Sequence, residues 1–163
     1  MLGIDLIRIE KEAYDNLFSK KEIYEQFIND TFPYPQVGFD TLCDLIEKDK
    51  NIIFLICETN LFKIYGLINI FNIDILSKRC NISFIWKNDF LIFKNTLVEI
   101  HRMLIENFRL NKISAYVYNF DVSIKEKLIE MSFLYEAKII DYGWKNGKYY
   151  DVEIFSLFFD LEE

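Results

Sequence analysis

The chain has 163 residues, enough for one domain with a complete hydrophobic core. Hydrophobic residues make up 52% of it and aromatic residues 17%, a composition that excludes an intrinsically disordered chain. The net charge of −7 argues against binding to nucleic acids or anionic membranes, because both need clustered cations. The same charge suits a cationic ligand such as an amine, and equally an ordinary acidic surface.

The cysteines and the N-terminus indicate a cytoplasmic protein. Cys43, Cys57 and Cys80 are odd in number and widely spaced, which predicts neither a disulfide framework nor a zinc site. With a single histidine in the chain, we expect no bound metal. Asp5 interrupts the first apolar residues, so no signal peptide is expected, and the longest apolar runs are too short to span a bilayer. We expect a single domain over residues 1–163.

Hydrophobic periodicity predicts the elements of the first half of the chain. A proline-containing segment at 31–35 ends the first helix, because proline cannot continue one. The expected elements are a strand at Ile4–Ile9, a helix at Glu10–Asn29, a short helix from Asp40 or Thr41 to Glu47, and strands at Asn51–Glu58 and Lys63–Asp74.

The second half alternates strands and helices before it ends in a hairpin. The Asn146-Gly147 pair is typical of a two-residue hairpin turn. The expected elements are strands at Asn81–Trp86, Ile113–Tyr118, Phe133–Tyr142 and Tyr149–Phe159, with helices at Asn95–Phe108 and Ser123–Met131.

Four local patterns stand out in the last two thirds of the chain: Tyr65–Ile68, Leu110–Val117, Lys125–Phe133 and Asn146–Val152. In this order and spacing they resemble the GCN5-related N-acetyltransferase (GNAT) superfamily, and in particular its ribosomal-protein and polyamine branch. The resemblance covers roughly residues 50–160 and implies an α/β fold of the GNAT type. That fold is a mixed, mostly antiparallel twisted sheet of about seven strands with helices on both faces. The sheet should splay between the strands at 81–86 and 113–118, leaving a V-shaped cleft.

The resemblance also implies acetyl-coenzyme A as the acyl donor. In the family, the strand that corresponds to 81–86 pairs with the pantetheine arm, and the loop that follows holds the pyrophosphate. An asparagine before the second helix also contacts the cofactor, and here it corresponds to Asn119 or Asp121. The implied cofactor-binding residues are Ser83, Phe84, Ile85, Lys87, Asn88, Lys94 and Asn119.

The expected pyrophosphate loop departs from the family pattern. No glycine occurs between Gly66 and Gly143, although the family places a glycine-rich motif in this interval so that the backbone can approach the anion. Asp89 stands in the corresponding stretch, where its carboxylate would either repel a diphosphate or cap the following helix. The alternative is that Lys87 and Lys94 supply compensating positive charge.

The catalytic residues are also changed. Leu128 occupies the position where many family members have a tyrosine that protonates the leaving thiolate. Glu58, at a strand end, is a candidate base or acceptor contact, and a solvated carboxylate is the plainer alternative. Tyr116 and Tyr118 share one strand face and are candidates to replace the missing acid, although packing explains them as well. His101 has the character of a packed histidine within a helix.

Two hypotheses about function follow. The first is an N-acyltransferase that moves an acetyl or other acyl group from coenzyme A to an amine of a small molecule or protein. The second is a catalytically degenerate GNAT domain that acts as a binding or assembly module. Trp144 and the Tyr149-Tyr150 pair are candidates for an acceptor wall or a homodimer contact, and a hairpin stabilised by aromatic pairs is the alternative.

Overall fold

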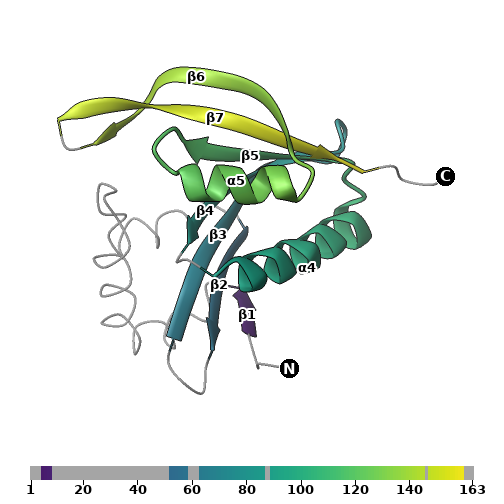
Figure 1. Ribbon diagram of the computed structural model, residues 1–163. Coiled ribbons are helices and arrows are strands. Elements are labelled where there is room, and N and C mark those ends of the chain that lie inside the picture. Colours follow the sequence, from purple (N-terminus) through teal and green to yellow (C-terminus); the bar gives the residue numbers. More distant parts are fainter. Residues whose placement is uncertain (1–4, 9–51, 59–62, 87–88, 146, 160–163) are drawn as a thin grey trace.

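A computed structural model describes residues 5–8, 52–58, 63–86, 89–145 and 147–159 (Figure 1). The helices expected at 10–29 and 40–47 lie outside the described residues. The strands are β1 (Asp5–Arg8), β2 (Ile52–Glu58), β3 (Lys63–Asp74), β4 (Arg79–Trp86), β5 (Lys112–Tyr118), β6 (Leu134–Lys145) and β7 (Lys148–Phe158). The helices are α4 (Phe90–Phe108) and α5 (Val122–Glu130).

The described strands form one seven-stranded sheet in the order β1-β2-β3-β4-β5-β7-β6. The β4–β5 pair is parallel and the other pairs are antiparallel. Helix α4 makes the crossover that a parallel pair requires. The expected mixed, mostly antiparallel sheet is therefore confirmed.

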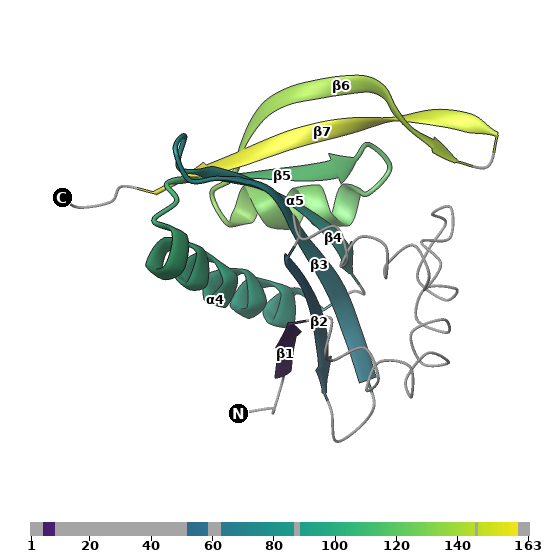
Figure 2. The same cartoon turned by 180° about the vertical axis from the view of Figure 1, so that it is seen from behind.

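Both described helices pack on the same face of the sheet. Figures 1 and 2 show α4 and α5 on one side of the central strands. Helix α4 buries residues at helical spacing, among them Phe93, Leu97 and Leu104, and α5 buries Ile124 and Leu128. These side chains join one core with the inward residues of β2–β5, such as Ile68 and Ile82.

The opposite face of the sheet, which we call the second face, carries a polar tract. Strand register places Asn69, Ser83 and Tyr116 side by side across β3, β4 and β5. Asn81 and Ser114 form the polar part of a neighbouring row. In β4 these polar positions alternate with buried apolar ones that face the helices, as the two-residue period of a strand requires.

Helix α4 begins at Phe90, five residues before the expected start at Asn95. Asp89 is the N-cap residue, and its side chain accepts a hydrogen bond from the Ile92 amide. The apolar run that follows is part of the helix because Ile92 and Phe93 are buried in the core. The loop after β4 is correspondingly short.

The parallel ladder between β4 and β5 ends before either strand does. Its last pair is Ser83 with Tyr116. Beyond it, β4 stays paired with β3 as far as Trp86, and β5 stays paired with β7 as far as Tyr118. The two central strands therefore separate at their C-terminal ends, which confirms the expected splay.

Candidate active site

The splay leaves one edge of β4 without a β5 partner. This edge comprises Phe84, Ile85 and Trp86, whose backbones pair only with β3 in the described sheet. Of the strand residues implied as cofactor contacts, Ser83 and Ile85 lie on the second face, whereas the Phe84 side chain is buried in the helix-side core. The splay thus presents backbone hydrogen-bonding groups rather than particular side chains.

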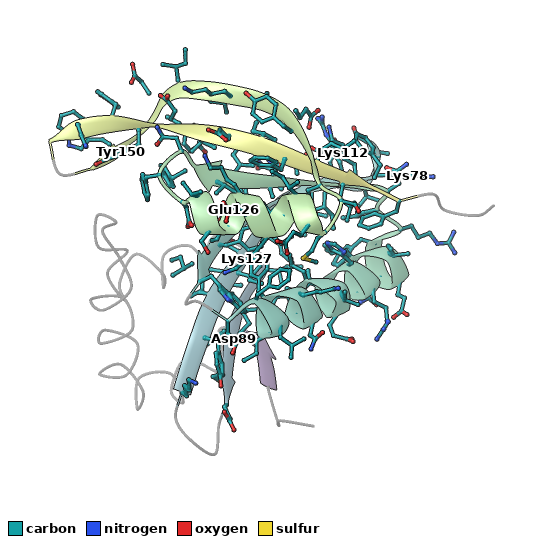
Figure 3. All side chains as sticks on the ribbon, in the orientation of Figure 1. Lys78, Asp89, Lys112, Glu126, Lys127 and Tyr150 are labelled. Atoms are coloured by element: carbon teal, nitrogen blue, oxygen red, sulfur yellow. The ribbon has the colours of Figure 1, made fainter. Side chains whose placement is uncertain are left out.

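The N-terminus of α4 is capped by the side chain of Asp89. The Asp89 Oδ1 atom lies 3.1 Å from the Ile92 amide nitrogen. The indole of Trp86 donates to the Asp89 carbonyl oxygen at 3.3 Å, and its ring lies edge-on to Phe93 at 5.0 Å. Figure 3 shows Asp89 at the start of α4. A carboxylate here both uses one of the free amides of the first turn and counters the positive end of the helix dipole.

Of the three lysine and asparagine candidates for this loop, the structure describes one. Lys94 is an exposed residue of α4, not of the loop before it as expected. Lys87 and Asn88 lie outside the described residues. The helix turn that follows Asp89 also exposes Phe90 and Leu91, which are apolar.

Two tyrosines lie where β4 and β5 separate. Tyr116 is the last β5 residue paired with β4, and its ring contacts those of Phe71 and Tyr142 with centroids 5.6 Å and 6.2 Å away. Tyr118 is half-buried and stacks on Phe120 with centroids 5.4 Å apart. Burial raises the pKa of Tyr118, and the nearby Tyr142 adds to the shift. Its hydroxyl therefore keeps its proton at neutral pH.

Asn119 and Asp121 have different roles at the end of β5. Asp121 caps α5 by accepting from the Ile124 amide at 3.3 Å, and burial raises the pKa of its carboxyl. The backbone amide of Asn119 donates a hydrogen bond to the Asp151 carbonyl oxygen at 3.0 Å, which fixes the backbone at this position. The buried side-chain oxygen of Asn119 has no hydrogen-bond partner in the described part of the chain. It is thus an acceptor in place for a donor from a ligand.

Glu58 lies far from Tyr116, the tyrosine at the last β4–β5 pair. Its carboxylate accepts a hydrogen bond from the Tyr65 hydroxyl at 3.1 Å. The row of paired residues through Tyr116 crosses β2 at Ile53, five residues from Glu58. With about 3.3 Å per residue and about 4.8 Å per strand, Glu58 and Tyr116 are roughly 20 Å apart.

The second face has a cavity of about 530 Å³, whose charged lining residues were not anticipated from the sequence. Tyr116 lines it together with residues that lie towards the start of β4 and β5, including Arg79, Asn81, Lys112 and Ser114. The signal was present, because polar residues alternate with apolar ones along both strands. What the sequence did not reveal is which strands are neighbours.

The remaining candidates are structural. Leu128 is fully buried, so this position of α5 contributes to the core. His101 packs against Phe133 and Phe159, with centroids 5.9 Å and 5.2 Å away, and burial lowers its pKa to about 4. Within the described ranges, no cluster of three or more His, Cys, Asp or Glu residues could hold a metal, and neither helix could cross a membrane.

Solved structures share this arrangement over nearly the whole chain. The ribosomal-protein-S5-alanine acetyltransferase of Vibrio fischeri has a TM-score of 0.73 at 15% identity, covering 99% of this chain and 96% of its own. A Staphylococcus epidermidis probable acetyltransferase scores 0.71 at 11% identity, covering 96% and 99%. A Vibrio cholerae spermidine N-acetyltransferase, solved with coenzyme A and spermine, scores 0.66 at 18% identity, covering 95% of each chain.

The chain has the GNAT fold. At these identities, the likeness establishes the fold alone. No protein-family model matches the sequence, and no curated protein does.

Coenzyme A fits one part of this GNAT-type site and not another. The unpaired edge of β4 beyond Ser83 suits the amide-containing pantetheine arm, and the Asn119 side-chain oxygen can accept an amide N–H. The N-terminus of α4 does not suit the diphosphate in the usual way, because Asp89 already holds the Ile92 amide and carries a negative charge. The site therefore favours recognition of the arm over recognition of the diphosphate.

Proposed function

We propose that the chain transfers an acyl group from coenzyme A to an amine of a small molecule or protein. The observation that carries the proposal is the separation of β4 and β5 after Ser83 and Tyr116. It creates an edge of backbone groups without a β5 partner, beside Tyr116, the last β5 residue that pairs with β4. The solved structures with the same fold that support this proposal are named as acetyltransferases of a polyamine and of a ribosomal protein.

The reaction needs little from side chains. The amine nitrogen forms a bond to the acyl carbon, the carbon–sulfur bond breaks, and the sulfur takes up a proton while the amine loses one. Backbone amides of the β4 edge polarise the carbonyl. Tyr118, whose pKa is raised by burial, holds a proton at this end of the sheet, and Tyr116 is the alternative donor. The placement of Glu58 gives it no part in this proposal.

The test is an acetylation assay with acetyl-coenzyme A and two acceptor classes, spermidine and a peptide with a free N-terminus. We expect thiol release together with acceptor mass increased by one acetyl group. Replacing the essential tyrosine, Tyr118→Phe or Tyr116→Phe, should lower kcat on the order of a hundredfold. Tyr135→Phe is the matched control, because Tyr135 is an exposed residue of β6 that packs on Phe155.

A binding or assembly module is the second candidate, and the Asp89 cap favours it. If the assay shows no acetyl transfer to spermidine or to the peptide, and acetyl-coenzyme A does not bind, the results would support this second function. Partners would then be proteins or a second copy of the chain. Trp144 and Tyr149, which face each other on β6 and β7 with centroids 4.8 Å apart, are both more than half exposed and are available for such a contact.

A further inference from the structure

The cavity on the second face has two walls that come from different strands of the sheet. Asn72 and Asp74 come from β3, Arg79 and Asn81 come from β4, and the facing wall comes from β5, β6 and β7. Its volume of about 530 Å³ falls within the usual range for sites that bind small ligands. Figure 3 shows Lys112, which lines the cavity, beside Lys78 and away from Asp89.

The charges on the described walls cancel. Arg79 pairs with Asp74 at 3.8 Å, and Lys112 pairs with Glu136 at 2.6 Å. Two cations thus face two carboxylates, and the described lining has no net charge. The rest of the lining is uncharged: it includes the apolar residues Ile73 and Ile154, while the side chains of Asn72 and Asn81 each offer amide donors and acceptors.

One wall is held in place by a network with a buried end and an exposed end. The second oxygen of Glu136 accepts from the Ser156 hydroxyl, which lies 2.9 Å from that of Ser114. The two serines are buried, whereas the Glu136 side chain is 42% exposed, so only the serine end is shielded from solvent. The Lys112 bond also lowers the pKa of the Glu136 carboxyl, which keeps the pair charged at neutral pH. A preformed wall of this kind binds a ligand without first being ordered.

The cavity reaches the splay through Tyr116. This residue lines the cavity and also forms the last β4–β5 pair, with Ser83. The pair of Arg79 with Lys112 lies four residues further back along both strands. At about 3.3 Å per residue this is roughly 13 Å, the length of an extended segment of about four residues.

We propose that this cavity holds the acceptor of the acyl transfer, and that the acceptor is the N-terminal segment of a peptide chain. The inference rests on the proposed function. An extended peptide presents alternating amide donors and acceptors, which the neutral polar lining can satisfy. A polyamine is a polycation and would need an excess of carboxylates, which the described walls lack.

The first test is calorimetric titration of the whole protein, without an acyl donor, with an alanine pentapeptide amide that has a free N-terminus. Asn81→Ala should weaken binding by about fivefold or more, because each hydrogen bond between a side-chain amide and a buried ligand contributes about 1 kcal/mol. Asn72→Gly is a second variant, because Asn72 has φ 51° and glycine keeps that backbone. Asn95→Ala, on the exposed side of α4, is the control and should bind as the wild type does.

The second test alters the charge of the cavity. Arg79→Gln leaves the described lining with one excess carboxylate, and spermidine affinity should rise roughly two- to fivefold while peptide affinity stays nearly constant. Tighter binding of spermidine than of the peptide to the wild type would overturn the inference. So would peptide binding that neither Asn81→Ala nor Asn72→Gly weakens.

The two proposals fail in different ways. Acetylation of spermidine that the cavity variants do not affect would leave acyl transfer standing and overturn the peptide assignment. Peptide binding that depends on Asn81 and Asn72, without transfer from acetyl-coenzyme A, would support the peptide assignment and contradict acyl transfer.

Discussion

Ser132 ends α5 in a backbone conformation that glycine adopts at lower free energy. Its φ is 68°, in the left-handed region. The Ser132 amide bonds to the Ile129 carbonyl at 3.0 Å, and the Phe133 amide bonds to the Leu128 carbonyl at 3.0 Å. This pattern is a Schellman motif, and Phe133 continues from it into the core. Ser132 therefore holds, with strain, a backbone conformation that glycine would adopt freely.

Ser132→Gly is therefore expected to stabilise the protein. The relief of the left-handed strain should exceed the added flexibility of the unfolded chain, for a net gain of roughly 0.5–1 kcal/mol. Chemical denaturation measures this directly. Ser132→Ala keeps the Cβ atom and should show no gain. A glycine variant no more stable than the alanine variant would contradict the strain argument.

His101 makes the stability depend on pH. It packs between aromatic rings, its Nε2 atom has no hydrogen-bond partner among the described residues, and burial lowers its pKa to about 4. An unfolded chain has a histidine pKa near 6.5. Between these values the unfolded state binds a proton that the folded state does not, so stability falls as the pH is lowered through the window.

The free energy of unfolding should decrease by roughly 2 kcal/mol from about pH 7.5 to about pH 5 through this one group. Denaturation at a series of pH values, with His101→Leu in parallel, isolates it. The leucine variant should lose most of the slope above about pH 5, where carboxylates titrate little. An unchanged slope in this variant would assign the pH dependence to other groups.

At the residue scale, the sequence was informative where the chemistry is local. Asp89 was expected either to cap the helix or to meet the phosphate, and the structure shows the cap. The cavity lining was missed because Arg79 and Lys112 are 33 positions apart and meet only through the β4–β5 pairing. A single sequence shows alternation along each strand but does not show which strands are neighbours.

At the scale of elements, periodicity predicted the strands and helices of the described residues closely. The boundaries of β3 match the expectation, whereas α4 begins five residues early. The reason is that Phe90–Phe93 was read as part of a loop by analogy, although the Asp89 cap and the buried pair Ile92 and Phe93 specify a helix. Because α4 begins early, the loop after β4 is short and the Asp89 carboxylate stands at the start of the helix.

Asp89→Asn separates the two effects of that carboxylate. Asparagine caps a helix as well as aspartate does, so the stability should change by less than about 0.5 kcal/mol. Removing the negative charge should lower the Kd for acetyl-coenzyme A roughly three- to fivefold, because the diphosphate is anionic. Titration calorimetry measures the affinity of the wild type and of Asp89→Asn for acetyl-coenzyme A. Glu99→Gln, which removes an exposed carboxylate paired with Arg102 further along α4, is the control. Equal affinities for the wild type and Asp89→Asn would place the diphosphate away from this helix end.

At the scale of the whole molecule, the order of elements along the chain was predictable, whereas the resemblance implied only that the sheet splays between the strands at 81–86 and 113–118. Strand and helix patterns follow from burial, but the placement of β7 between β5 and β6 does not follow from periodicity. The expected helices of the first fifty residues lie outside the described part of the chain. What the fold adds to the sequence is the splay, which leaves the end of β4 without a β5 partner just beyond Tyr116.

The proposed acyl transfer requires that the β4 edge still binds the pantetheine arm although the usual diphosphate site is lost. Thermal unfolding with and without acetyl-coenzyme A tests it most directly. At about a hundred times the Kd, a bound ligand adds roughly 2.7 kcal/mol, which for a domain of this size raises the Tm on the order of 5–10 °C. Adenosine 3′-phosphate 5′-diphosphate, which keeps the diphosphate and lacks the arm, should give a much smaller shift. No shift with acetyl-coenzyme A at millimolar concentration, or an equal shift with both compounds, would contradict the account.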